Sequence, residues 1–249
     1  LTMAHAGAPR VAADEVGFSG IVTNLADDAP VTGARIGANG RWATTDADGR
    51  YFLPLPPGTY HVRAEADGFI GMTERYRRVP ETGAASLDIR MVPSDPSPED
   101  ERAIAARVLS APTPSADAFP ADAPGLSAVT NAPETIHVLM SDGYAVAMTL
   151  DEYLQGVVPR EVPPNWPLEA LKAQAVAARS YAATARRHAS SDPETDAHVC
   201  TTTHCQAWSP THYDTTDRAI ADTRGVVATY DGAVISAYFH AHCDGHTLN

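Results

Sequence analysis

Several features that mark common classes of protein are scarce in this chain of 249 residues. Acidic residues outnumber basic ones by 31 to 18, which gives a formal net charge of −13. A general nucleic-acid-binding protein needs basic surface to displace counterions from phosphates, so nucleic acid is not an expected partner. No apolar run reaches the roughly 18 residues of a membrane-spanning helix. The residues after Leu1 lack a basic segment followed by an apolar one, so the sequence is interpreted as a mature or truncated product without its signal segment.

Cysteine is also scarce, and its positions are informative. Three cysteines are too few for a disulfide-rich scaffold, and an odd number leaves at least one unpaired if two of them bridge. All three lie after residue 199, in a region rich in histidine. This clustering predicts a site in the C-terminal part of the chain.

Residues 15–92 predict a small antiparallel β-sandwich, because short alternating segments are separated by turn residues. The expected strands cover residues 18–23, 41–45, 51–55, 60–66 and 87–92. Residues 46–49 (DADG) predict a hairpin connection between the second and third of these strands, since glycine can adopt positive φ. Turn formation accounts for Asp46 and Asp48 more simply than a calcium site does.

The rest of the chain divides by composition. Residues 93–132 are rich in proline, alanine, serine and aspartate and predict a linker, with room for a short helix near residues 98–109. Residues 133–249 predict a mixed domain of helices and strands, so the expected class of the whole chain is α+β. Its expected elements are a hairpin over 135–149, a short helix over 150–156 and a second hairpin over 225–239.

A long helix is predicted from Pro167 onward, because apolar residues recur with a period of 3.6. This stripe is rich in alanine and is interpreted as core scaffold. Just ahead of it, Glu161 lies in a segment that Pro159 and Pro163 stiffen, and a carboxylate on a rigid turn is a candidate acid catalyst. The alternative is an ordinary turn glutamate that faces solvent. Glu152 and Glu169 are weaker candidates, because helix termini explain both.

A dense set of metal-binding side chains follows the long helix, at His198, Cys200, His204 and Cys205. Zinc accepts thiolate and imidazole ligands in tetrahedral sets, so these four residues predict a zinc site. A closed shell would be structural, whereas three protein ligands would leave an open catalytic position. A cysteine nucleophile assisted by histidine is disfavoured, because the adjacent His204 and Cys205 are poorly placed for proton transfer.

A second set of such side chains lies near the end of the chain, at His240, Cys243 and His246. Cys243 is able to bridge Cys200 or Cys205 in an oxidising compartment, and Cys243 and His246 are alternative zinc ligands. If these histidines bind no metal, they would form a polar surface that binds sugar hydroxyls.

The N-terminal segments PVTGARI, TTDADGRYFLPLPPGTYHVRAEADGF and SLDIRMV resemble the carboxypeptidase regulatory-like domain, a transthyretin-like β-sandwich found beside many secreted enzymes. The resemblance covers residues 15–92. It implies a spacer or adhesion module without chemistry of its own.

The C-terminal segments MTLDEYLQGVVPREVPPNWPLEALKAQAVAARSYA, VCTTTHCQAW and AIADTRGVVATYDGAVISAYFHAHCDGHTLN resemble, in order, the stage II sporulation protein D (SpoIID/LytB) family. The resemblance implies a peptidoglycan lytic transglycosylase that cleaves the MurNAc–GlcNAc bond with one glutamate, Glu161, and leaves 1,6-anhydro products. Some members carry zinc, which the resemblance assigns here to the cysteine and histidine set. Other members are described as amidase enhancers, so a noncatalytic peptidoglycan-binding partner of a cell-wall amidase is the alternative. A zinc-dependent cell-wall hydrolase is the third possible function.

The same resemblance places the protein outside the cytoplasm, in the cell envelope or secreted, with glycan strands of peptidoglycan as its partner. The candidates for substrate contacts are Thr203, Gln206, Tyr238 and His240. Family members normally continue beyond Asn249, so the domain is expected to be truncated at its C-terminus. Asp244 departs from the glycine that is common at its position.

Overall fold

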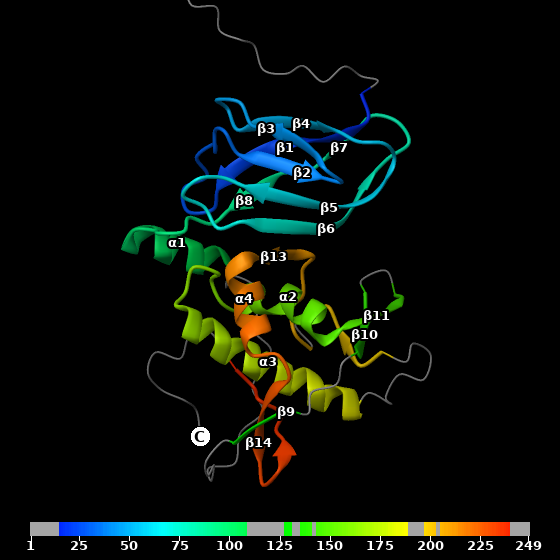
Figure 1. Cartoon of the computed structure of the whole chain (residues 1–249), viewed down its shortest axis with the longest axis vertical. Coiled ribbons are helices and arrows are strands. Elements are labelled where there is room, and N and C mark those ends of the chain that lie inside the picture. The colour runs from blue at the N-terminus through cyan, green and yellow to red at the C-terminus, as the bar shows by residue number, and fades with distance from the viewer. Residues whose placement is uncertain are drawn as a thin grey trace, which may run out of the picture. The chain divides into compact units, whose positions relative to one another are not determined.

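The computed structural model describes residues 15–108, 127–130, 135–140, 143–188, 197–202 and 205–239. The chain forms two compact units that divide between Ile104 and Ala105 (Figure 1). The first unit contains β-sheets, and the second combines helices with strands, which confirms the expected α+β class. Helix α1 (Pro98–Val108) lies at the division between them. Among the helices that the structure describes, none is long and apolar enough to cross a membrane.

Two sheets enclose the core of the first unit. In one, β1 (Gly17–Asn24) pairs antiparallel with β4 (Arg50–Pro54) and parallel with β7 (Ala84–Ser86) and β8 (Ile89–Met91). In the other, the order is β6-β5-β2-β3, with bounds Met72–Val79, Gly58–Glu65, Arg35–Ala38 and Arg41–Thr44. Inward side chains from both sheets are almost fully buried: Phe18, Val22, Ile36, Leu53, Val62, Ile89 and Met91.

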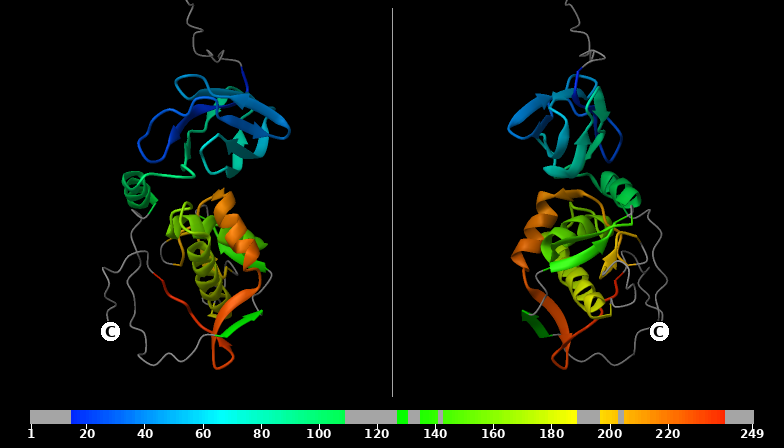
Figure 2. Two further views of the ribbon diagram at one scale, coloured as in Figure 1. Left: turned by 60° about the vertical axis from the view of Figure 1, so that its left-hand side comes forward. Right: turned by 90° about the vertical axis from the view of Figure 1, so that its right-hand side faces the viewer.

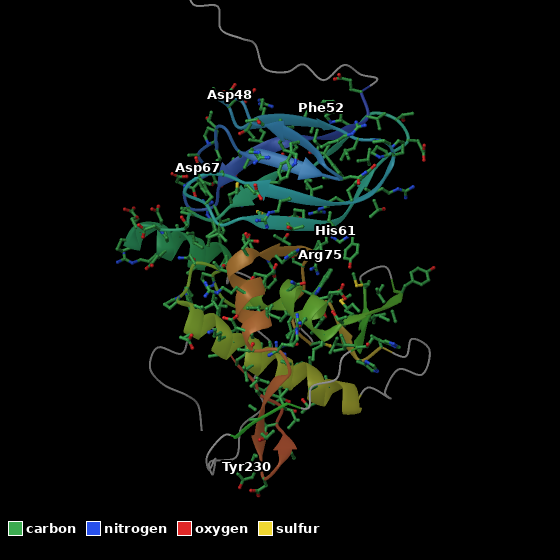
Figure 3. All side chains as sticks on the ribbon, viewed as in Figure 1. Asp48, Phe52, His61, Asp67, Arg75 and Tyr230 are labelled. Carbon is green, nitrogen blue, oxygen red and sulfur yellow. The ribbon has the colours of Figure 1, made fainter. Side chains whose placement is uncertain are left out.

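The hairpin predicted around residues 46–49 is wrong, although its turn forms. Strand β3 pairs with β2 and strand β4 pairs with β1, so the two flanking strands belong to different sheets. The Asp46 carboxylate accepts the backbone N–H groups of Asp48 at 3.0 Å and Arg50 at 2.8 Å, and Gly49 has a φ of 72°. Figure 3 shows Asp48 in this loop. The aspartate therefore stabilises the turn, as the sequence indicates, but the loop connects two sheets.

Two small sheets form the strand portion of the second unit. The predicted hairpin at residues 135–149 is present as β10 (Thr135–Leu139) and β11 (Ala145–Thr149), and β12 (Val199–Cys200) pairs parallel with β10. In the other sheet, β14 (Val226–Tyr230) pairs with β15 (Ala233–Val234) and with β9 (Ser127–Thr130).

The second small sheet confirms one prediction and revises another. Asp231 and Gly232, with φ of 48° and 76°, make the predicted turn between β14 and β15, and Figure 3 shows Tyr230 just before it. The hairpin is shorter than predicted, since β15 ends at Val234. Strand β9 lies inside the segment predicted as linker, yet it pairs with β14 over four residues.

Three helices of the second unit contribute side chains to a common apolar core, and Figure 2 shows the helices grouped together in both views. They are α2 (Leu150–Glu161), α3 (Leu168–His188) and α4 (Asp214–Asp222), and the short strand β13 (Thr211–Tyr213) leads into α4. The α3 residues Leu171, Ala175, Ala178 and Ala182 are almost fully buried. Alanine side chains are short, so neighbouring helices and strands approach the α3 backbone closely.

A buried arginine joins these elements. Arg179 of α3 is 1% exposed and donates hydrogen bonds to the carbonyls of Ile220 at 3.1 Å and Val226 at 3.2 Å. It also donates to the Thr223 hydroxyl at 3.2 Å and lies 3.6 Å from the Asp151 carboxylate. A guanidinium so enclosed needs these acceptors to offset its lost hydration. Arg179 therefore ties α3 to the C-terminal end of α4, to β14 and to the first turn of α2.

The first helix of this core is longer than predicted. Helix α2 does not stop at Gly156 but continues through Pro159 to Glu161, and Val162 caps it by donating its N–H to Val158 at 3.1 Å. Most residues of the last two turns are buried, and this packing outweighs the poor helix propensities of glycine and proline. Glu161 is therefore the last residue of a helix, and the expectation that it lies in a turn is corrected.

The N-terminus of α2 carries a capping box that can be tested. The Thr149 hydroxyl accepts the Glu152 N–H at 3.2 Å, and the Glu152 carboxylate accepts the Thr149 N–H at 2.8 Å. Thr149→Ala is expected to lower the free energy of unfolding by about 1 kcal/mol, because one helix N–H loses its acceptor. Urea denaturation measures this loss. Thr149→Ser is the matched control and should stay within a few tenths of a kcal/mol of the parent protein, since serine caps equally well.

Candidate functional site

Glu161 occupies an environment suited to an acid catalyst. Burial raises the pKa of its carboxyl group above the ordinary value of 4.5, and the positive charge of Arg160 and a hydrogen bond from the Ala207 backbone N–H act in the opposite direction. The neighbouring Val157, Val158 and Val162 are almost fully buried and belong to the core. A carboxyl group with a raised pKa keeps its proton at higher pH than an exposed one, as a general acid requires.

The loop that carries Ala207 is held against α2 by close packing at a glycine. Ser209 donates its N–H to the Gly156 carbonyl at 3.1 Å, and Trp208 donates its N–H to Thr201 at 3.3 Å. A Cβ atom at Gly156 would lie 2.2 Å from Trp208 Nε1 and 2.5 Å from the Ser209 carbonyl oxygen. Only glycine admits so close an approach, so Gly156 sets the distance between this loop and the helix that ends at Glu161.

Tyr153 of α2 is affected electrostatically by both Glu161 and the cysteines. Its side chain is fully buried, and its hydroxyl has no hydrogen-bond partner among the described residues. Burial raises the pKa of Tyr153 well above its ordinary value, and Cys205, Tyr181, Cys200 and Glu161 add to the effect in that order. These groups are therefore close enough to act on one phenol, which indicates that the candidate acid and the cysteine pair lie in the same region of the second unit.

Cys200 and Cys205 lie side by side. Their sulfur atoms are 2.8 Å apart, and the Cys200 backbone N–H also points to the Cys205 sulfur at 3.1 Å. Burial, followed by the hydrogen bond with Cys200, raises the pKa of the Cys205 thiol to about 12. Both residues are partly exposed.

His198, another predicted zinc ligand, faces strand β10. Its Nδ1 accepts the backbone N–H of His137 at 3.0 Å, and the two imidazole rings are stacked with centroids 4.9 Å apart. Because Nδ1 is occupied as an acceptor, metal binding by His198 would have to use Nε2. His198 thus lies immediately before β12, two residues ahead of Cys200, and its ring packs on a histidine of the neighbouring strand β10.

The described residues do not by themselves complete a zinc site. Two thiolates on one tetrahedral zinc lie about 3.8 Å apart, given Zn–S bonds near 2.3 Å, whereas the sulfurs of Cys200 and Cys205 are closer than that. Within the part of the chain that the structure describes, no three His, Cys, Asp or Glu side chains gather as a metal site requires. His204, Cys243 and His246 lie outside the described residues. Zinc binding by this set of residues stays a prediction.

The predicted substrate contacts fall in two groups. Gln206 is 3% exposed and donates its amide to the Ala178 carbonyl at 3.4 Å, so its side chain lies against α3. Tyr238 is 54% exposed and packs edge-on against Tyr181 with ring centroids 5.8 Å apart. Thr203 and His240 lie outside the described residues. The substrate-binding roles of all four stay predictions.

Three groups of this region were not singled out by the sequence: the Tyr153 phenol, the Tyr181 side chain and the backbone N–H of Ala207. Burial raises the pKa of Tyr181 to about 12, with further contributions from Cys205, Tyr238 and Cys200. Tyr153 and Tyr181 occur within helical segments, where an aromatic residue is usually core. A backbone donor leaves no trace in a sequence at all.

Comparison with known proteins identifies both parts of the chain. The carboxypeptidase regulatory-like domain matches residues 17–92, and the stage II sporulation protein (SpoIID) family matches residues 143–230. An uncharacterized protein of Brachyspira hyodysenteriae is 41% identical over 106 residues, which cover 40% of this chain and 27% of that protein. The amidase enhancer of Bacillus subtilis is 38% identical over 95 residues, which cover 38% of this chain and 12% of that protein. The chain thus spans a minor part of the length of either relative.

Solved structures add little to these matches. A chain of a cohesin–X-dockerin complex from Acetivibrio cellulolyticus is 19% identical, with 31% of this chain and 58% of that chain covered and a TM-score of 0.27. A likeness of this size supports no argument about function. From the sequence matches, the chain joins a carboxypeptidase regulatory-like domain to a domain of the stage II sporulation protein family.

Proposed function

We propose that this protein is a lytic transglycosylase of the cell wall, in which Glu161 is the single acid and base. The observation that carries the proposal is the position of Glu161 at the end of α2, where burial raises its pKa and the Ala207 N–H holds its carboxyl group. The SpoIID match over residues 143–230 and the likeness to the amidase enhancer support a role at the cell wall. We accordingly expect the protein outside the cytoplasm, with the glycan strands of peptidoglycan as its substrate.

The chemistry needs only one carboxyl group. Protonated Glu161 donates its proton to the glycosidic oxygen, and the bond from that oxygen to the muramic acid C1 breaks. The C6 hydroxyl of the same sugar then bonds to C1, which closes a 1,6-anhydro ring, and Glu161 accepts the hydroxyl proton. The carboxyl group ends the cycle protonated, and no water is consumed. A second acid is not needed, because the sugar supplies its own nucleophile.

The products provide the test. Purified glycan strands incubated with the protein should yield fragments with 1,6-anhydromuramyl ends, which mass spectrometry separates from hydrolytic products because they lack one water. Reducing-end products that retain that water would contradict the transglycosylase mechanism.

The rate should also depend on pH in a defined direction. Glu161 must be protonated to act, so activity is expected to be constant below its pKa and to fall about tenfold per pH unit above it. Because burial raises that pKa above 4.5, the falling limb should lie at higher pH than for an ordinary carboxyl group. A pH–rate profile of kcat/KM on glycan strands measures this limb. A midpoint at or below 4.5 would show that burial does not tune this group.

A second function is favoured by one observation, the match to the Bacillus subtilis amidase enhancer. In that case the protein would bind peptidoglycan and increase the activity of a cell-wall amidase, without cleaving glycan itself. Stem-peptide release by a purified amidase, measured with and without this protein, distinguishes the two. Enhancement without any anhydro product would favour this second function.

A further inference from the structure

An exposed tryptophan rests on the outer face of the β-sandwich in the first unit. Trp42 of β3 is the cross-strand partner of Gly37 in β2 and is 45% exposed. Ile36 is fully buried in the core, so its neighbour Gly37 faces outward. A Cβ atom at Gly37 would lie 2.5 Å from Trp42 Cδ2 and Cε3. Gly37 therefore lets the indole ring lie directly on the strand, and any larger residue would have to lift it.

Charged side chains hold positions beside this ring. The Arg35 guanidinium lies over it, with Cζ 4.4 Å from the ring centroid, which is a cation–π contact. On the neighbouring strand β5, Arg63 donates a hydrogen bond to the Glu65 carboxylate at 3.2 Å, and Arg35 lies 3.9 Å from the same carboxylate. Two arginines thus share one glutamate. The four residues Arg35, Trp42, Arg63 and Glu65, here called the outer cluster, carry a net positive charge.

The whole sheet is basic, although the chain is acidic. Its strands β2, β3, β5 and β6 contain six arginines and two glutamates, whereas the chain as a whole has a formal charge of −13. One of those glutamates, Glu74, is buried and paired with Arg77 at 2.6 Å. A sheet of this sign favours an anionic partner. An aromatic ring beside guanidinium groups suits a sugar that carries a carboxylate, because the ring packs on the sugar and arginine binds the carboxylate.

We propose that the outer cluster binds the acidic glycan strands of the cell wall, at a site separate from Glu161. The choice of this polymer rests on the proposed function. A muramic acid without its stem peptide packs its sugar ring against Trp42, and its lactyl carboxylate accepts N–H groups of Arg35 and Arg63. The exposed ion pairs with Glu65 contribute little, so a ligand carboxylate replaces them at small cost. Two attachments to one polymer strengthen binding without new contacts at either site.

Binding is measured on the full chain carrying Glu161→Gln, so that the strands stay intact. Purified glycan strands freed of stem peptides are immobilised, and surface plasmon resonance gives the Kd. Trp42→Ala and Arg35→Ala are each expected to raise the Kd by about tenfold. Gly37→Ala should raise it by several fold, because the methyl group lifts the indole ring. Arg90→Ala is the matched control on β8 of the other sheet, where the arginine side chain is 61% exposed, and should leave the Kd unchanged.

Three further observations decide the outcome. Urea denaturation checks that each variant is folded. Conversion of the lactyl carboxylates to amides should weaken binding by the parent at least as much as Arg35→Ala does. The inference would be overturned by undiminished binding to the amidated strands, or by Trp42→Ala and Arg35→Ala with the Kd of the Arg90→Ala control.

The same measurements separate this inference from the proposed function. Strands that bind through Trp42 but yield no 1,6-anhydro ends with the parent chain would contradict the proposed function alone. Strands that are cleaved by the parent chain, but bind all variants equally, would overturn the outer cluster as a binding site alone.

Discussion

Glu161→Gln is expected to reduce the cleavage of glycan strands by about 10³-fold while leaving the fold intact. Glutamine has nearly the shape of glutamate and keeps an oxygen that accepts the Ala207 N–H, but it has no proton to give to the glycosidic oxygen. Burial penalises the charged form of Glu161, so replacement by a neutral amide removes that penalty and should not destabilise the protein. Counting 1,6-anhydromuramyl ends over time gives the rate, and circular dichroism with urea denaturation checks the fold.

The matched control is Glu169→Gln in the first turn of α3. The Glu169 side chain is 83% exposed and pairs with Lys172 at 3.0 Å, a surface contact that contributes little to stability. This variant should retain the parent rate. Equal rates for Glu161→Gln and the parent chain would remove Glu161 from the mechanism and show that another group catalyses the cleavage. Equal losses in both variants would point to a general effect of charge.

The features that sequence analysis predicted correctly depend on local periodicity or local turn chemistry. The apolar residues of α3 recur every 3.6 positions, and the structure buries that stripe. In the same way, Asp231 and Gly232 favour positive φ and produce the β14–β15 turn. Asp46 also forms its predicted turn, but which sheet each flanking strand joins depends on strands far away in the sequence, and that part of the prediction was wrong.

The error in the helix that leads to the candidate site has the same cause. Gly156 was expected to end a helix, because glycine commonly follows the last helical residue. It lies inside α2 instead, since the Trp208 side chain and the Ser209 carbonyl pack against it from about fifty residues further along the chain. The contact of the His198 ring with His137, which comes from a strand sixty-one residues earlier, could not be foreseen from spacing either, and the role of His198 as a zinc ligand stays a prediction. Long-range packing of this kind has no local signature.

Gly156→Ala is the second substitution with a large expected effect. Helix propensity alone would favour alanine by about 1 kcal/mol inside α2. The added Cβ would lie 2.2 Å from Trp208 Nε1 and 2.5 Å from a backbone oxygen, contacts that real Cβ atoms do not make. Overpacking of this kind costs roughly 1–3 kcal/mol, so the net result is expected to be a loss of stability despite the better propensity. Urea denaturation of the parent and variant measures the sign directly.

The same substitution should lower activity, because the loop displaced from Gly156 is the one whose Ala207 N–H holds Glu161. A displacement near 1 Å at a positioning group is enough to reduce a rate by about 10²-fold.

Gln155→Ala, one residue earlier in α2, is the control for adding alanine to this helix and should keep most of the parent activity. Trp208→Ala in the Gly156→Ala background should recover part of the lost stability, since it removes one of the two clashing partners. If Gly156→Ala raises stability and leaves the rate unchanged, the loop is free to move away from the helix. In that case Gly156 does not position the acid.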